Sequence, residues 1–243
     1  MSAPQPQTAR IHALDLARSF ALVGMVIYHS VYDLTWFGLL PAGLATTGFW
    51  SYFARMVAGS FVLLAGVSLY LAHGHQFRSR AYWRRLGVIA LAAAGVSLAT
   101  YVADPSRFVY FGILHSIAVS SLIGLAFLRL PTVAILIGAA VFFVVPQYVI
   151  GGVFDHPALV WLGLGAQHPP SMDYEPIFPW AGPFLLGLAL AKAADAAGLW
   201  QGLRGRGESL RWLAWPGRHS LAIYLVHQPI LFGLAYLAAR VLA

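Results

Sequence analysis

A histidine and an aspartate lie one helical turn apart in an otherwise apolar stretch, FALVGMVIYHSVYDL, residues 20–34. They are His29 and Asp33. A carboxylate at position i+4 of a helix can accept a hydrogen bond from one imidazole nitrogen, fix the tautomer and stabilise the charged ring. The second nitrogen is then free to take a proton from a substrate. The spacing predicts general-base chemistry, and a buried histidine satisfied by its helix neighbour is the structural alternative.

Two further ionisable side chains interrupt apolar runs at a depth similar to that of His29. Arg55 and His115 each lie about two helical turns inside the outer end of an apolar run. Because ionisable groups at membrane depth turn toward protein or water, we expect both to line one cavity with His29 and Asp33. Arg55 would bind an anionic group or an oxyanion there, or it would pair with Asp33. His115 also has a structural interpretation, because it lies beside a ridge of small residues that favours helix packing.

The C-terminal run GRHSLAIYLVHQPI carries His227 and Gln228 near one helix face. Pro229 frees the carbonyl of Leu225, so these side chains either belong to the site or repair the helix. Asp173, near the end of a long loop, is a further candidate for contact with a substrate. Acidic residues and histidines of that loop show no known metal-ligand spacing, and no metal site is expected. Asp15 and Arg18, at i and i+3, are expected to form a structural ion pair.

The composition decides where these residues lie. Hydrophobic residues make up 60% of the 243 residues and charged residues only 9%, which excludes an ordinary soluble domain. The chain has no cysteine, so thiolate catalysis and disulfides are excluded. Its net charge of +7 does not indicate a nucleic-acid partner, because the basic residues lie between apolar runs instead of forming one patch. The protein is expected to be an integral membrane protein.

The predicted fold is an all-α bundle of about seven transmembrane helices, each near the roughly 20 residues that span a bilayer. The expected spans are 13–35, 48–72, 82–103, 107–129, 132–150, 177–194 and 218–241. Residues 1–12 would form a cytoplasmic tail and 13–243 a single polytopic membrane domain with an outer loop over 151–176. Eleven of the fifteen basic residues lie in cytoplasmic segments if the N-terminus is inside and the C-terminus outside. Prolines predict a kinked or partly non-helical start of the sixth span.

Three blocks of the sequence carry a family resemblance. Residues 10–34, RIHALDLARSFALVGMVIYHSVYDL, resemble the N-terminal signature of the heparan-alpha-glucosaminide N-acetyltransferase catalytic-domain family, and also the opening helix of the acyltransferase-3 membrane acyltransferases. Residues 173–180 are similar to the family's DYFPLFPW segment, and residues 217–230 to GRxSLxIYLxHQPxL. Ser19 replaces the usual glycine after Arg18, and Glu175 replaces an aromatic residue.

The resemblance implies a membrane acyltransferase that passes an acyl (acetyl) group from cytoplasmic acyl-CoA to a sugar amine or hydroxyl on the outer side. His29 would be the catalytic histidine, and His227 and Gln228 the C-terminal pair. Acyl-CoA is the expected co-substrate, with no metal or haem. Arg84 and Arg85 lie where the phosphates of CoA could dock, although membrane topology alone also explains them. The expected partners are the lipid bilayer and a small-molecule or glycan acceptor, and the expected location is a bacterial inner (cell) membrane.

Two other classes of function fit the same residues. A transporter or lipid-handling membrane protein would use the histidines and Asp33 to relay protons or to bind a ligand without covalent chemistry. A bis-histidine haem protein would use two of His29, His115 and His227. Acyl transfer from acyl-CoA separates the enzyme from the first alternative, and an optical spectrum tests the second.

Overall fold

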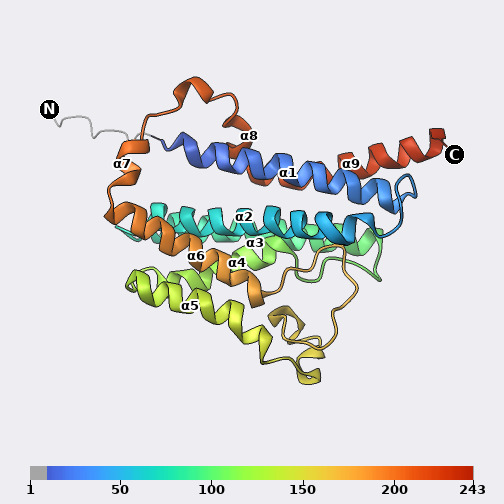
Figure 1. Cartoon of the computed structure of the whole chain (residues 1–243), viewed down its shortest axis with the longest axis horizontal. Coiled ribbons are helices and arrows are strands. Elements are labelled where there is room, and N and C mark those ends of the chain that lie inside the picture. The colour runs from blue at the N-terminus through green and yellow to red at the C-terminus, as the bar shows by residue number, and fades with distance from the viewer. Residues whose placement is uncertain (1–9, 243) are drawn as a thin grey trace. The chain divides into compact units, whose positions relative to one another are not determined.

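The computed structural model describes residues 10–242. The expected cytoplasmic tail, 1–12, therefore falls mostly outside the described residues. Helices form the architecture of the described part of the chain (Figure 1): α1 (His12–Trp36), α2 (Gly48–His73), α3 (Ser79–Ala103), α4 (Ile113–Phe127), α5 (Thr132–Val144), α6 (Ile177–Ala196), α7 (Leu199–Leu203), α8 (Trp215–Arg218) and α9 (Ser220–Leu242). Short 3₁₀ turns occupy Leu44–Thr46, Val145–Gln147, Gly152–Asp155, Val160–Leu162 and Glu208–Leu210.

Five of the described helices are long and apolar enough to cross a membrane: α1, α2, α3, α6 and α9. The sequence predicts seven spans. The predicted spans 107–129 and 132–150 contain α4 and α5, which have 15 and 13 residues. Helices of that length rise about 20 Å, less than the roughly 30 Å of a hydrocarbon core. The all-helical membrane architecture is supported, while seven spans and the orientation of the termini stay predictions.

The chain divides into two compact units. The first contains residues up to 58 and from 195 onward, and the second contains residues 59–194. Helix α2 contributes its first part to one unit and its remainder to the other. A single membrane domain over 13–243 stays a prediction.

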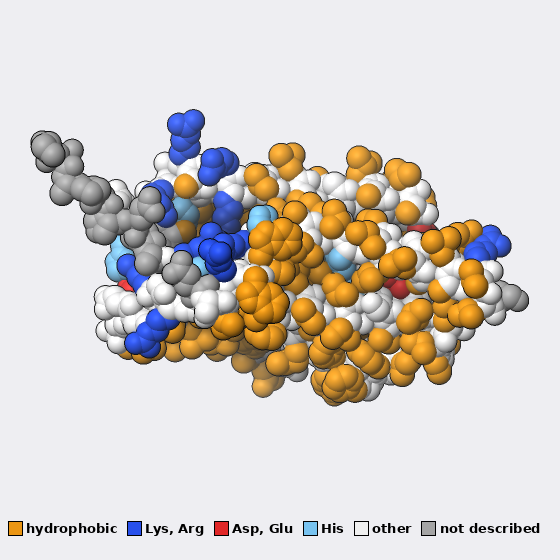
Figure 2. Space-filling view, turned by 90° about the horizontal axis from the view of Figure 1, so that it is seen from above, with side chains coloured by type: hydrophobic (Ala, Val, Ile, Leu, Met, Phe, Trp, Pro, Cys, Tyr) orange, Lys and Arg blue, Asp and Glu red, His pale blue; other side chains and the backbone are white. Residues whose placement is uncertain are grey.

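In the first unit, α1 and α9 run parallel. His29 contacts His227, and Phe37, eight residues further along α1, contacts Phe232, which also lies further along α9. Outward-facing side chains on both helices are apolar, as Phe20 and Ile230 illustrate with exposures of 73% and 56%. Figure 2 shows hydrophobic side chains over the middle of one face and basic ones gathered toward the end where α1 begins. This distribution is typical of helices that face lipid.

In the second unit, glycines let α2 and α6 approach closely. A Cβ atom added to Gly66 would lie 2.0 Å from the carbonyl oxygen of Phe184, and one added to Gly187 would lie 2.1 Å from that of Leu63. Small residues at a crossing allow this backbone contact in membrane helices. The side chain of Phe184 is fully buried at the same crossing. The crossing therefore forms part of the packed core of the second unit.

The start of α6 is irregular, as the prolines predicted. Phe178 has φ −96° and ψ 121°, which are non-helical values within the helix. Ahead of it, Tyr174 forms an isolated parallel bridge with Phe111, and the backbone N–H of Glu175 donates to the Phe111 oxygen at 2.9 Å. The end of the loop is therefore fastened to the segment that leads into α4.

Candidate functional site

The rings of His29 and His227 pack edge to face where α1 lies along α9. Their centroids are 5.0 Å apart and their planes meet at 66°. His227 is buried and His29 is half-buried. The axial imidazoles of a bis-histidine haem stand on opposite sides of the porphyrin, so this direct ring contact does not fit such a pair.

His227 presents a nitrogen lone pair to this contact region. Its Nδ1 atom lies 2.6 Å from the backbone oxygen of Tyr224. Since a carbonyl oxygen only accepts, Nδ1 carries the hydrogen, and Nε2 of the neutral ring carries the lone pair. Nε2 is buried without a hydrogen-bond partner among the described residues. With Nδ1 protonated, Nε2 of the neutral ring is a buried proton acceptor. His227 Nδ1 contacts the Tyr224 oxygen, so it does not serve as the donor for the Leu225 carbonyl that Pro229 frees.

Asp33 makes its hydrogen bond across to α9. The side-chain amide of Gln228 donates from Nε2 to Oδ1 of Asp33 at 2.8 Å. Asp33 is only 1% exposed. The sequence suggested that the carboxylate would hold the ring of His29, but the described residues show no hydrogen bond between the two, and Nδ1 of His29 is unpartnered. A partner 195 positions away in the chain replaces the neighbour at i+4.

Four buried polar atoms in this region have no hydrogen-bond partner among the described residues: His29 Nδ1, Asp33 Oδ2, His227 Nε2 and Gln228 Oε1. An unpaired buried polar atom costs about 1–3 kcal/mol, so several in one place call for an explanation. A carboxylate oxygen, an amide oxygen and an imidazole lone pair all accept hydrogen bonds. We call His29, Asp33, His227 and Gln228 together the histidine-pair site. It is suited to a ligand that brings N–H or O–H donors.

Arg55 shows no contact with the histidine-pair site among the described residues. Its side chain is exposed, and its guanidinium lies over the ring of Tyr52, 5.9 Å from the centroid. The described residues show no ion pair between Arg55 and Asp33. A weak cation–π contact on an exposed face is what the structure gives this arginine.

His115 lies in the second unit, where both of its ring nitrogens are used. The backbone N–H of Gly112 donates to Nδ1 at 3.3 Å, and Nε2 lies 3.3 Å from the hydroxyl of Ser97. That hydroxyl donates to the backbone oxygen of Val109 at 2.7 Å. His115 thus ties α3 to the first turn of α4. The shared cavity of Arg55, His115 and His29 stays a prediction.

Asp173 caps the same helix. Its Oδ2 atom accepts a hydrogen bond from the backbone N–H of Ile113 at 3.0 Å. A carboxylate at a helix N-terminus satisfies a free donor and interacts favourably with the helix dipole. The neighbouring Tyr174 hydroxyl donates to the oxygen of Val160 at 2.7 Å, and burial raises the pKa of this phenol. The end of the loop is therefore held in place by the carboxylate of Asp173 and the hydroxyl of Tyr174.

Arg84 and Arg85 lie in the first turns of α3, and both are exposed. Arg85 also borders a small cavity whose walls include His73 and Tyr82. The hydroxyl of Tyr82 donates to the oxygen of Ser121 at 3.0 Å, which fixes one wall. The two arginines are thus accessible to an anionic ligand at this end of the second unit.

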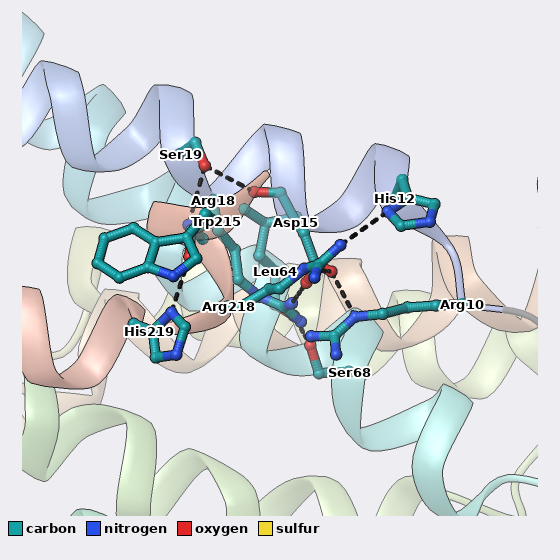
Figure 3. Close-up of polar contacts among 11 residues, drawn as sticks. Arg10, His12, Asp15, Arg18, Ser19, Leu64, Ser68, Trp215, Arg218 and His219 are labelled. Carbon is teal, nitrogen blue, oxygen red and sulfur yellow. Dashed lines mark hydrogen bonds and ion pairs between the residues drawn. The ribbon is translucent and has the colours of Figure 1, made fainter. Parts of the chain in front are cut away.

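Sequence reasoning found only part of a second polar cluster, around Asp15. The expected ion pair with Arg18 is confirmed at 2.8 Å. Arg10 and Arg218 also contact the same carboxylate, at 2.6 and 3.7 Å (Figure 3). Arg218 lies in the third block of family resemblance, residues 217–230, and that resemblance is the sequence feature that could have indicated it. Among residues 10–242, no group of three or more His, Asp or Glu side chains is arranged to hold a metal ion.

Comparison with known proteins identifies the family. The sequence model described as "Heparan-alpha-glucosaminide N-acetyltransferase, catalytic" matches residues 10–229. Searches of curated proteins and of solved structures give no significant match. The matched range covers most of the chain and includes α1, with His29 and Asp33, and the part of α9 that carries His227 and Gln228. The chain therefore belongs to the heparan-alpha-glucosaminide N-acetyltransferase catalytic-domain family.

Proposed function

We propose that this protein transfers an acetyl group from cytoplasmic acetyl-CoA to an amine or hydroxyl of a sugar on the outer side of a bacterial cell membrane, with His29 as the catalytic residue. Family membership implies an acetyltransferase-like function. The observation that carries the finer proposal is the group of four buried, unpartnered polar atoms of the histidine-pair site. Acyl transfer needs a base on the nucleophile, and an imidazole of this site is the group proposed to supply it.

The proposed reaction begins with the acceptor held by its own donors. Hydrogen bonds from the sugar to Asp33 Oδ2 and Gln228 Oε1 would orient its amine or hydroxyl toward His29. The imidazole of His29 takes the proton as the nucleophile attacks the thioester carbon. Collapse of the tetrahedral intermediate breaks the carbon–sulfur bond, and the thiolate of CoA leaves and takes up the proton. The lone pair of His227 lies beside His29 and can share this proton.

Gln228 is a positioning residue in this scheme. Its amide holds Oδ1 of Asp33, which leaves Oδ2 as the oxygen available to the acceptor. The carboxylate also stabilises positive charge that develops on the nucleophile or on a nearby ring. Arg84 and Arg85 are the proposed contacts for the pyrophosphate of the donor, and because both are exposed, their contribution should fall as salt is added.

A transporter or lipid-handling protein without covalent chemistry is the second candidate, because unpartnered acceptors can bind a ligand without reacting with it. The test is an assay of purified protein in lipid nanodiscs with radiolabelled acetyl-CoA. Glucosamine supplies an amine, and glucose serves as the hydroxyl-only comparison. The proposal expects free thiol and acetylated sugar to appear in equal amounts.

The matched control replaces an exposed histidine of the same unit. His29→Ala should abolish acetylation, whereas His219→Ala should not, because His219 is exposed and its Nδ1 contacts only the Trp215 backbone oxygen, 3.0 Å away. Sugar binding without thiol release in the wild type would favour the transporter. Thiol release that does not depend on any sugar would contradict transfer to a sugar acceptor.

A further inference from the structure

Three arginines converge on one buried carboxylate near the start of α1. Asp15 is 3% exposed and receives Nε of Arg10 at 2.6 Å and Nη1 of Arg18 at 2.8 Å. Nε of Arg218 lies 3.7 Å from the same carboxylate (Figure 3). All four residues belong to the first unit. We call them the arginine cluster.

The backbone fixes this cluster in place. A Cβ atom on Gly217 would lie 1.8 Å from the oxygen of Asp15, so only glycine lets α8 come this close to α1. The N–H of Gly217 donates to the hydroxyl of Ser19 at 2.9 Å, and that hydroxyl donates to the Asp15 oxygen at 3.1 Å. Arg218 follows directly, so its approach to the carboxylate is set by the backbone and by Ser19. The cluster is preorganised.

The cluster carries more positive charge than Asp15 neutralises. Arg218 Nη2 lies 3.2 Å from Nδ1 of His12. A guanidinium only donates, so His12 accepts and is neutral. Three guanidiniums against one carboxylate leave two positive charges on this group of residues.

Part of this charge is accessible to a ligand. The side chains of Arg10 and Arg218 are 56% and 27% exposed. Arg10 uses its Nε toward Asp15, and its two terminal amino groups have no partner in the part of the chain that the structure describes. Such a pair of amino groups matches two oxygens of a phosphate.

We propose that the arginine cluster binds a phosphomonoester dianion. A phosphomonoester carries close to two negative charges near neutral pH and offers three strong acceptor oxygens, which matches the excess charge and the open end of Arg10. A phosphodiester carries only one negative charge and would leave the cluster half neutralised. Two sources share this chemistry: the 3′-phosphate of CoA, which rests on the proposed acetyl-CoA-dependent function, and the headgroup of a phosphatidic acid lipid.

The test compares ligands that differ by this one group. Titration calorimetry of the full-length protein in nanodiscs of neutral lipid measures the affinity for CoA and for 3′-dephospho-CoA. In parallel, thermal unfolding is measured in nanodiscs with and without phosphatidic acid. The variants are Arg10→Gln, an exposed replacement that leaves Arg18 and Arg218 on Asp15, the double variant Arg84→Gln/Arg85→Gln, and Arg211→Gln as the control. Arg211 is an exposed arginine of the same unit that does not contact Asp15.

If CoA is the source, CoA should bind at least about tenfold more tightly than 3′-dephospho-CoA, and Arg10→Gln should remove that difference while Arg211→Gln keeps it. If a lipid is the source, the two CoA forms bind equally, and phosphatidic acid stabilises the wild type and Arg211→Gln but not Arg10→Gln. The proposal is overturned if the wild type shows neither the CoA preference nor stabilisation by phosphatidic acid. It is also overturned if Arg211→Gln loses the effect as fully as Arg10→Gln. The proposal is also overturned if the affinity difference between CoA and 3′-dephospho-CoA is lost in the Arg84→Gln/Arg85→Gln variant but kept in Arg10→Gln. If the protein transfers acetyl groups but neither the 3′-phosphate of CoA nor phosphatidic acid has an effect, this phosphate site is refuted and the proposed function still stands.

Discussion

The histidine-pair site and the His115 region contain the same types of residue, a histidine and an aspartate, yet they differ in how their polar atoms are used. In the first, Nδ1 of His29 and Oδ2 of Asp33 are buried without partners. In the second, both ring nitrogens of His115 and Oδ2 of Asp173 contact backbone or hydroxyl groups. This difference between the two histidines is our ground for proposing a binding site at the histidine pair and a structural contact at His115; on α4 the buried hydroxyls of Ser116 and Ser120 are also unpartnered among the described residues.

The position of each pair along its helix explains the difference. His115 and Asp173 meet the first turn of α4, where backbone N–H groups have no partner within the helix. His29 lies well inside α1 and His227 well inside α9, where the backbone N–H groups are already engaged in helical hydrogen bonds. Side-chain acceptor atoms at such positions find no free backbone N–H group nearby, so their donor must be another side chain or a ligand.

The largest expected effect is on turnover, from His29→Ala. We expect acetyl transfer to fall about 10²–10⁴-fold, because the base is lost, while the protein stays inserted and monodisperse. Turnover is measured with radiolabelled acetyl-CoA and divided by the amount of folded protein from size-exclusion chromatography. Near-normal turnover in a well-folded variant would refute the role of His29 and remove the contrast with His115.

A smaller loss of turnover is expected from Asp33→Asn. The asparagine oxygen can still accept from Gln228, but an amide N–H replaces the acceptor Oδ2 and the negative charge disappears. Turnover should fall about 10–100-fold, less than for His29→Ala, because the base itself remains. The ratio of kcat/KM values between the two variants checks this order. A larger loss in Asp33→Asn than in His29→Ala would make the carboxylate the catalytic group.

His115→Ala should affect stability instead of chemistry. The change removes the acceptor for the Gly112 N–H and the contact with Ser97, which should lower the free energy of unfolding by about 1–3 kcal/mol. Turnover per folded molecule should stay within about twofold, since each tenfold change needs 1.4 kcal/mol at the reacting groups. Thermal unfolding of detergent-solubilised protein measures the first effect. A stable variant with lost turnover would place His115 back among the catalytic candidates.

The smallest effect is expected from Arg55→Gln. A cation–π contact on an exposed face contributes about 0.5–1 kcal/mol, so both the melting temperature and turnover should change little. Arg55→Lys serves as the control that keeps the charge. Strong loss of turnover in Arg55→Gln with rescue in Arg55→Lys would show that Arg55 acts on the substrate, as the sequence suggested, and would extend the site beyond the histidine pair.

The sequence predicted the parts of the fold that follow from local chemistry. Apolar runs located the five long helices, and prolines predicted the irregular start of α6 at Phe178. The i,i+3 spacing predicted the pair of Asp15 and Arg18. These predictions succeed because the responsible residues are neighbours in the chain.

Contacts between distant segments were not predictable in the same way. The bond from Gln228 to Asp33 joins residues 195 positions apart, and no spacing rule connects them. The approach of Arg218 to Asp15 depends on Gly217, which is needed only because α8 packs against α1. Sequence reasoning named His29, Asp33, His227 and Gln228 as candidates, but not how they pair.

The most direct test of the histidine-pair site is nitrogen NMR of protein labelled with ¹⁵N-histidine, with resonances assigned through single His→Gln variants. The contact with the Tyr224 oxygen predicts that Nδ1 of His227 carries hydrogen. Addition of a non-hydrolysable acetyl-CoA analogue and glucosamine should shift the ring nitrogens of His29 and His227 and leave those of His115 in place. Shifts confined to His115, or none at the histidine pair at saturating ligand, would contradict the claim that the unpartnered nitrogens receive the substrates.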